Sequence, residues 1–380
     1  MSASANVEML ATDKIAWQLG PFHPALPGPL GLRLQLDGER IVGCEWQRGF
    51  CGRNLEKTVE GQLWCGTVVV AGRVDPENAL FGEWAFVEAV EKLSGIDVPA
   101  RAQWIRLIIG ELARVSNHLR FAARMAQAVR CETVFHYLLR DREKFLDLFE
   151  LVTGARFGHH YVRFGGVSQD ITDGFVERAL EVCDEMRLRI QEYNDLFTYH
   201  HAFLMRTTYA GVLPGALALD LGVSGPNVRA SGVSRDERMR PDNERFTEIG
   251  FLPQLGTGDY GIPGDVHSRF VIRLREAQQS LDLVREATLR MKPGAFWNDL
   301  GLGLWIIPPE GEGTAFVESP RGSLGCHVIS SGGSQPERVH FITPSTFSLV
   351  TVPDVLLGCR LEDLGVILAS LDLSMAEVDR

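Results

Sequence analysis

Six arginines fall within one short stretch of an otherwise acidic chain. The chain has a formal net charge of -11, yet residues 99–131 contain a single acidic residue, Glu111. The arginines of this stretch are Arg101, Arg106, Arg114, Arg120, Arg124 and Arg130. Arginine stays ionised and binds planar anions through a fixed fork of donors. The stretch therefore indicates either an anionic partner held by the fold or, as the ordinary alternative, a charged face exposed to solvent.

The same stretch has the pattern of one long amphipathic helix. It contains no proline after Pro99 and one glycine, Gly110. On a helical wheel its large apolar residues share one arc. The opposite arc carries the polar residues Gln103, Arg106, Glu111, Arg114, Asn117 and His118.

The cysteines offer only weak metal-binding signals. The chain has seven, none in a C-x-x-C pair, and the odd number disfavours a disulfide framework or a zinc ribbon. Cys44, Cys51 and Cys65 lie close enough in sequence to suggest a metal site, but free cysteines are ordinarily small, buried, apolar residues.

Two histidine pairs, at 159–160 and 200–201, are equally ambiguous. Neighbours in a helix point about 100° apart, so neither pair forms a metal clamp alone, and satisfied or exposed histidines are the ordinary alternative. The chain has neither a phosphate-binding loop nor a dinucleotide fingerprint. These motifs identify no reaction.

Composition narrows the class of protein. The 380 residues are 45% hydrophobic and 23% charged, as in ordinary globular proteins. The acidic charge argues against general nucleic-acid binding. No apolar run is long enough to span a bilayer, and the N-terminus has no secretion signal. We therefore expect a cytoplasmic protein that reaches a membrane only through partners.

Hydrophobic periodicity predicts a mainly helical α+β fold. Residues 13–70 are predicted to be β structure, with a hairpin that turns at Asp37-Gly38. Helices are predicted at 84–93, 99–131, 134–154, 175–206, 267–291 and 361–369, and strands within 316–345. Gly95 and Gly154 are expected to end the first and the third of these helices. The predicted organisation is a β-rich region (1–70), a long-helix bundle (71–300) with an irregular glycine-rich segment (209–264), and a C-terminal β/α region (301–380), all in one structural domain.

Ordered blocks along nearly the whole chain carry a family resemblance. They include GPFHPALPGPLGLRLQLDGE (20–39), RGFCGRNLEKTVEG (48–61), AVEKLSGIDVPARAQWIRLIIGELARVSNHL (89–119), RDREKFLDLFELVTGARF (140–157), GVSGPNVRASGVSRDER (222–238), GDVHSRFVIRLREAQQSL (264–281), ESPRGSLGCHVISSGGSQPERVHFITPS (318–345) and AEVDR (376–380). With these blocks the chain resembles the D-type core subunit of respiratory complex I. It is also similar to the large subunits of membrane-bound, energy-converting [NiFe] hydrogenases.

The resemblance implies a position beside an iron–sulfur cluster on a small partner subunit. Arg101 falls on the family's arginine beside that cluster, Arg106 on a second basic residue, and His159 adjoins Gly158, where the family has a cluster-tuning histidine. Positive charge near a thiolate-ligated cluster raises its reduction potential. Other charged residues on family positions include three candidate catalytic residues, Glu56, Asp379 and Arg380. Arg120, Arg124 and Arg130 are left as ordinary surface residues.

The chain departs from the family at both reaction sites. The nickel-binding C-x-x-C pairs fall on residues 75–78 and 374–377, where there is no cysteine. Hard oxygen ligands do not replace thiolates at nickel, so we expect no nickel site and no hydrogenase activity. The family's quinone-contacting histidine and tyrosine fall on Pro27 and Pro76, and the aspartate that partners the histidine falls on Ala128; none of these three residues can titrate. His23, on the same N-terminal hairpin as Pro27, is the candidate replacement.

These observations favour a peripheral-arm core subunit of a complex-I-like oxidoreductase on the inner face of the cell membrane. Its partners would be an iron–sulfur small subunit and complex-I-like peripheral and membrane subunits, and it would pass electrons toward a quinone or another acceptor while binding no cofactor of its own. The alternative is a redox-silent scaffold of such a complex. An unrelated soluble helical enzyme is disfavoured by the ordered blocks.

Overall fold

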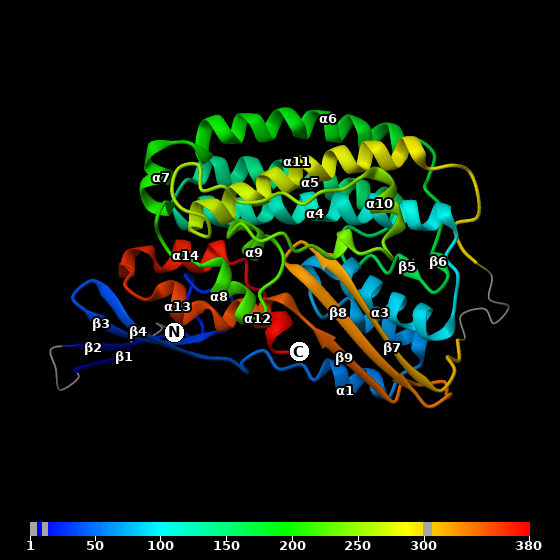
Figure 1. The fold of residues 1–380 in the computed structure, drawn as a ribbon, viewed down its shortest axis with the longest axis horizontal. Helices are drawn as coiled ribbons and strands as arrows, with labels where there is room; N and C mark the ends of the chain where they lie inside the picture. The colour runs from blue at the N-terminus through cyan, green and yellow to red at the C-terminus, as the bar shows by residue number, and fades with distance from the viewer. Residues whose placement is uncertain (1–5, 10–13, 299–305) are drawn as a thin grey trace.

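A layer of long helices lies over two small sheets (Figure 1). The computed structural model describes residues 6–9, 14–298 and 306–380; the predicted β/α region at 301–380 therefore has its residues 301–305 outside the described chain. The long helices are α4 (Ala100–Ala128), α5 (Glu132–Thr153), α6 (Phe175–Tyr193) and α11 (Val266–Arg290). Among the described residues no helix is both long and apolar enough to cross a bilayer.

Helix α4, of 29 residues, confirms the amphipathic helix predicted at 99–131 but not an exposed charged face. It packs against α5, α11 and α14 (Leu364–Ser370). Its polar arc is buried as completely as its apolar arc: the side chains of Arg106, Glu111 and Arg114 are all inaccessible to solvent or nearly so. A solvated face was therefore the wrong interpretation, because α3, α11 and the irregular segment cover this arc with groups that pair its charges.

Several helix ends follow the predicted signals. Gly95 ends α3 (Ala79–Ser94) and Gly154 ends α5, both at positive φ, which glycine adopts without steric cost. The predicted single helix at 175–206 is wrong. After α6 the chain makes a π-helical turn (Asn194–Thr198), and α7 (His201–Thr207) begins anew because extended His200 caps it by accepting the N–H of Ala202.

The N-terminal sheet is antiparallel, in the order β1 (Asn6–Met9), β2 (Ile15–Leu19), β3 (Gly31–Asp37) and β4 (Arg40–Gln47). Its β3–β4 hairpin confirms the predicted turn. Strand structure beyond β4 is wrong: residues 55–60 and 64–71 form α1 (Leu55–Glu60) and α2 (Trp64–Ala71). Trp64, Val68 and Ala71 bury one helical face at spacings of four and three, a pattern that a strand cannot present to one side.

The C-terminal sheet confirms the predicted strands. β7 (Gly311–Ser319), β8 (Gly322–Ser330) and β9 (Arg338–Ile342) are antiparallel, and α3 packs against them. The predicted helix at 361–369 starts as a 3₁₀ turn (Leu361–Asp363) and continues as α14.

Short elements complete the chain. They are the pair β5 (Val162–Arg163) and β6 (Gly166–Val167), the 3₁₀ turns η1 (Pro76–Asn78) and η3 (Glu237–Met239), and the helices α8 (Gly215–Asp220), α9 (Pro226–Ala230), α10 (Glu244–Ile249), α12 (Pro344–Val350), α13 (Val352–Leu356) and α15 (Met375–Val378). The predicted glycine-rich segment therefore contains four of these elements, and the fold is mainly α with small sheets, as predicted.

Candidate functional site

A cavity of about 510 Å³ lies between the β2–β3 loop, the C-terminal end of α4 and α14. Pro27 and Ala128 both line it. These are two of the three positions at which the family resemblance places residues of the quinone site, and they come from segments about 100 residues apart in sequence. The third, Pro76, is not among the residues that line the cavity. The β2–β3 loop and α4 thus border one cavity at these two positions, although their side chains differ from those of the family.

His23 lies on the wall of this cavity, as its predicted role requires. Its Nδ1 accepts the backbone N–H of Ala25 at 3.2 Å. In the neutral ring the proton therefore resides on Nε2. No described residue bonds that nitrogen, so it can donate to an oxygen atom placed in the cavity.

Arg124 and Arg130 also line the cavity, although the sequence was not interpreted to place them there. Helical spacing could have indicated this position for Arg124, because it precedes Ala128 by four residues and so shares its face of the helix. Arg124 is half-buried, and its one hydrogen bond within the described chain is a long one, 3.4 Å, to the carbonyl of Pro27. Arg130 is exposed, at a positive φ of 63°.

A buried ion cluster lies where the resemblance places the nickel cysteines. The first positions of the two motifs, Asp75 and Ser374, meet at 3.4 Å between Oδ1 and Oγ. Arg321, in the β7–β8 turn, is bonded to Asp75 and, at 2.5 Å, to Glu77, and Asp372 approaches its Nε within 3.5 Å. The donors are hard oxygens already neutralised by a guanidinium. This set does not fit a nickel ion.

Arg120 belongs to this cluster, so its interpretation as a surface residue was wrong. Its side chain is 12% exposed and is bonded to Glu77, with Asp372 3.6 Å away. Beside it, burial and the neighbouring charge of Asp75 raise the pKa of Glu377 to about 8. The cluster therefore contains a carboxyl group that stays protonated at neutral pH.

A second buried network joins α4 to α11, β7 and the irregular segment. Arg229 contacts Glu276 at 2.6 Å, Glu318 at 2.7 Å and Asp236 at 3.0 Å. On α4, His118 lies 3.3 Å from the same Glu276, and burial lowers the pKa of its imidazole. A further group, all buried, consists of Glu111, Arg114, Arg238 and Ser280. Such pairs fix the geometry of elements because separating them exposes an uncompensated buried charge.

Glu56, Asp379 and Arg380, three of the candidate catalytic residues, lie close together, but they join the chain's two ends rather than line the cavity. Asp379 accepts the N–H groups of Gly49, at 2.9 Å, and Cys51, at 3.1 Å. Arg380 donates to Glu56 at 3.0 Å. Although burial would raise the pKa of Glu56, the Phe341 N–H and Arg380 hold it below its ordinary value. The geometry is that of a structural clamp.

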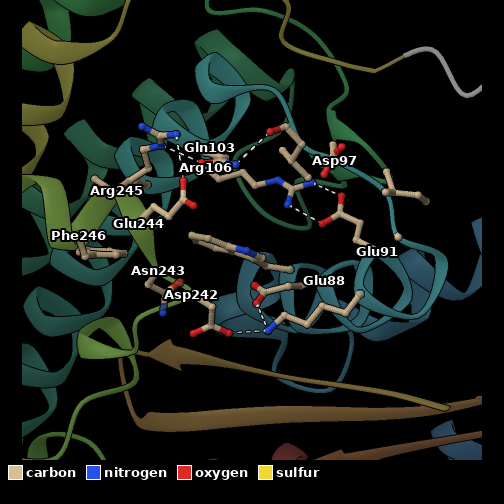
Figure 2. Close-up of a pocket in the computed structure, with 16 residues that line it drawn as sticks. Glu88, Glu91, Asp97, Gln103, Arg106, Asp242, Asn243, Glu244, Arg245 and Phe246 are labelled. Carbon is tan, nitrogen blue, oxygen red and sulfur yellow. Dashed lines mark hydrogen bonds and ion pairs between the residues drawn. The ribbon is translucent and has the colours of Figure 1, made fainter.

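Arg106 links α4 to neighbouring parts of the fold (Figure 2). It forms a two-pronged ion pair with Glu91, at 2.7 and 2.9 Å, and donates to the carbonyl of Gly166 at 2.8 Å. Its side chain is 4% exposed, although Arg106 and Glu91 lie on the wall of a cavity of about 360 Å³. Little of this guanidinium is left to face a partner subunit.

Arg101 and His159 retain some exposure. Arg101 is 17% exposed and paired with Asp170 at 2.9 Å. The ring of His159 packs on Phe149, with centroids 4.8 Å apart, and burial lowers its pKa. Arg101 opens α4, whereas the cavity lies at that helix's other end. The predicted cluster-facing and acceptor-facing residues are thus not brought together, and their proximity to a partner's cluster stays a prediction.

The chain is similar to a set of respiratory proteins over almost its full length. The family described as "Respiratory-chain NADH dehydrogenase, 49 Kd subunit" matches residues 129–302 and 304–380. The D-type subunit of the NADH-quinone oxidoreductase of Desulforamulus reducens is 36% identical over 370 residues, 97% of this chain and 99% of that protein. The corresponding subunit from Thermus thermophilus is 34% identical over 394 residues, 98% of this chain and 95% of that protein.

A solved structure agrees with these sequences. One chain in the structure of the membrane-bound sulfane sulfur reductase (MBS), an archaeal respiratory membrane complex, superposes with a TM-score of 0.91 at 30% identity. The match covers 98% of this chain and 100% of that one.

Proposed function

Because this chain belongs to the family of the 49 kDa subunit of respiratory-chain NADH dehydrogenase, we propose that it is the core subunit of the peripheral arm of a complex-I-like membrane oxidoreductase. In that role it holds the electron acceptor in the cavity between the β2–β3 loop and α4. The observation that carries the proposal is the meeting of Pro27, Ala128 and His23 on one cavity wall.

The partners follow from the same assignment. An iron–sulfur small subunit supplies electrons, and membrane subunits hold the chain at the inner face of the cell membrane. Electron transfer falls steeply with distance, so the donating cluster must lie near the cavity. Arg101 begins a 29-residue helix whose other end forms the cavity wall, about 40 Å away at 1.5 Å per residue. The proposal therefore does not rely on Arg101 as a neighbour of that cluster.

His23 is the residue of this chain that can take part in reduction of an acceptor. Reduction of a quinone carbonyl adds electrons and protons to its oxygen. The Nε2–H of His23 can donate a hydrogen bond to that oxygen and so stabilise the negative charge that develops on it, while Nδ1 stays fixed by the backbone N–H of Ala25. Water supplies the protons of the reduction through the open side of the cavity.

The test uses the intact purified complex, which is reduced with dithionite, freed of the excess dithionite by gel filtration and then mixed with a short-chain naphthoquinone as acceptor. His23→Gln should lower the rate of acceptor reduction at least about tenfold, the effect of losing one positioned hydrogen-bond donor, while the partner cluster still becomes reduced by dithionite, as followed by electron paramagnetic resonance. His201→Gln, at an exposed histidine on α7, is the matched control. Equal turnover of wild type and His23→Gln would refute the role of His23.

A scaffold function is the second candidate, and the observation in its favour is the loss of titratable groups at Pro27, Pro76 and Ala128. A scaffold would support assembly of the complex without binding an acceptor. In that case no naphthoquinone would bind to the complex at this chain, and the cavity substitutions would leave turnover unchanged.

A further inference from the structure

The last two arginines of the arginine-rich stretch differ from the others in having no ionic partner among the residues that the structure describes. Arg101, Arg106 and Arg114 each lie within 4.0 Å of a carboxylate, as does Arg120. Within the described parts of the chain, Arg124 and Arg130 have no carboxylate within that distance. Both line the cavity of about 510 Å³.

The surroundings of Arg124 do not neutralise it. The charge of Arg124 helps to lower the pKa of the buried Asp372, but that carboxylate already contacts Arg321 and Arg120. Glu132 is the acidic residue among those lining the cavity; it is exposed and forms no ion pair with any described residue. Two arginines against one carboxylate leave the cavity net positive before His23 is counted.

The rest of the wall strengthens an ionic contact rather than competing with it. Leu26, Pro27, Ala128 and Ala369 present apolar surface, which lowers the local dielectric constant and raises the strength of an interaction between charges. A guanidinium matches the oxygens of a planar anion with paired donors. The cavity therefore combines apolar walls, two guanidinium groups and one histidine donor.

We propose that this cavity binds an anionic oxygen group on a flat apolar body, the chemistry of an acidic hydroxyquinone, with Arg124 and Arg130 on the charge and His23 on a neighbouring oxygen. The inference rests on the proposed function and specifies its substrate class as an acceptor that carries negative charge. An anionic lipid headgroup shares the same chemistry and is separated from it by the test.

The experiment measures binding to the intact, oxidised complex by equilibrium dialysis. The probes are 2-hydroxy-1,4-naphthoquinone, which is ionised at neutral pH, and neutral 1,4-naphthoquinone, which has the same ring system. The anionic probe should bind at least tenfold more tightly. Arg124→Gln and Arg130→Gln should each weaken its binding about tenfold, as loss of a charge-assisted hydrogen bond requires, and leave the neutral probe unchanged.

Two variants control for folding and for charge alone. Arg33→Gln removes an exposed arginine of β3, away from the cavity, and should change neither affinity. Arg124→Lys keeps the charge but loses the paired donors and should fall between wild type and Arg124→Gln. Equal affinity for both naphthoquinones, or unchanged anion binding in Arg124→Gln, would overturn the inference while leaving the proposed function in place.

Vesicles separate the two sources of the anion. Should neither naphthoquinone bind, the proposed acceptor function fails. In that case, binding of the complex to phosphatidylglycerol vesicles is compared with its binding to phosphatidylcholine vesicles. This comparison decides whether the cavity binds an anionic lipid headgroup. Loss of binding to the anionic vesicles in Arg124→Gln would support a headgroup site, and no difference between the vesicles would refute anion binding altogether.

Discussion

The arginines of α4 fall into two groups that differ in their partners. Toward the start of the helix, Arg106 and Arg114 are buried against fixed carboxylates. Toward its end, Arg124 has none among the described residues and borders a cavity. The residue type and the helix are the same, so the partner decides the role. Paired arginines hold elements together, and an unpaired arginine at a cavity remains available to a ligand.

Arg106→Met gives the largest expected effect and tests the first half of the comparison. It leaves Glu91 buried without its partner, and breaking a buried pair in this way costs about 3–5 kcal/mol of unfolding free energy. The measurement is urea unfolding of the purified chain. Arg124→Met, the matched change at the other end of the helix, should cost less than about 1 kcal/mol.

The double variant Glu91→Gln with Arg106→Met sharpens this result. Removing both charges should recover part of the lost stability, because no unpaired ion then remains in the interior. Equal costs for Arg106→Met and Arg124→Met would contradict the division into paired and available arginines.

Glu377→Gln should have an intermediate effect that depends on pH. The folded pKa of Glu377, about 8, lies above its ordinary value of 4.5. Its protonated form therefore contributes stability that is fully present below pH 4.5 and is lost as the pH rises through 8. Glutamine does not ionise, so at a pH of about 9 the variant should be more stable than wild type by more than about 1 kcal/mol. Parallel stability profiles of the two proteins from about pH 6 to 9 would show that Glu377 does not titrate in this range.

Glu56→Gln should have the smallest effect and tests the clamp, which is half-exposed. The folded pKa of Glu56 lies below 4.5, so its contribution is present above that value and is lost as the pH falls through the folded pKa. The variant should be less stable than wild type at about pH 7, by about 1 kcal/mol or less. The difference should disappear in acid, as measured by urea midpoints at both pH values. A difference that persists in acid would assign the loss to packing rather than charge.

Local pattern predicted the elements whose signals lie within one stretch of chain. The β3–β4 hairpin, the full length of α4 and the glycine ends of α3 and α5 depend on turn residues and helical periodicity, and these were predicted correctly. The helices within residues 55–71 were not predicted, because the sequence pattern does not show that Trp64 and Val68 are buried on the same side. The break at His200 depends on one side-chain cap within a continuous helical pattern.

The candidate site was less predictable for a different reason. Whether an arginine is paired depends on residues distant in sequence: Arg321 lies 246 residues from Asp75, and Arg106 is 60 residues from Gly166. A helical wheel shows that Arg106 and Arg114 share a face, but it does not show what covers that face. The resemblance located Pro27 and Ala128, and only the fold shows that they border one cavity with Arg124.

The length and burial of α4 have a mechanical consequence. Its 29 residues span roughly 43 Å. On its inner face Arg114 donates a hydrogen bond to the Glu318 carbonyl of β7, and Glu111 forms an ion pair with Arg238 of the irregular segment. A helix held at so many points does not slide alone, so an axial shift of α4 would carry the elements tied to it. A partner that docks at Arg101 and causes such a shift would move Arg124 and Ala128 by the same distance, and the far cavity would change shape without any contact between the two sites.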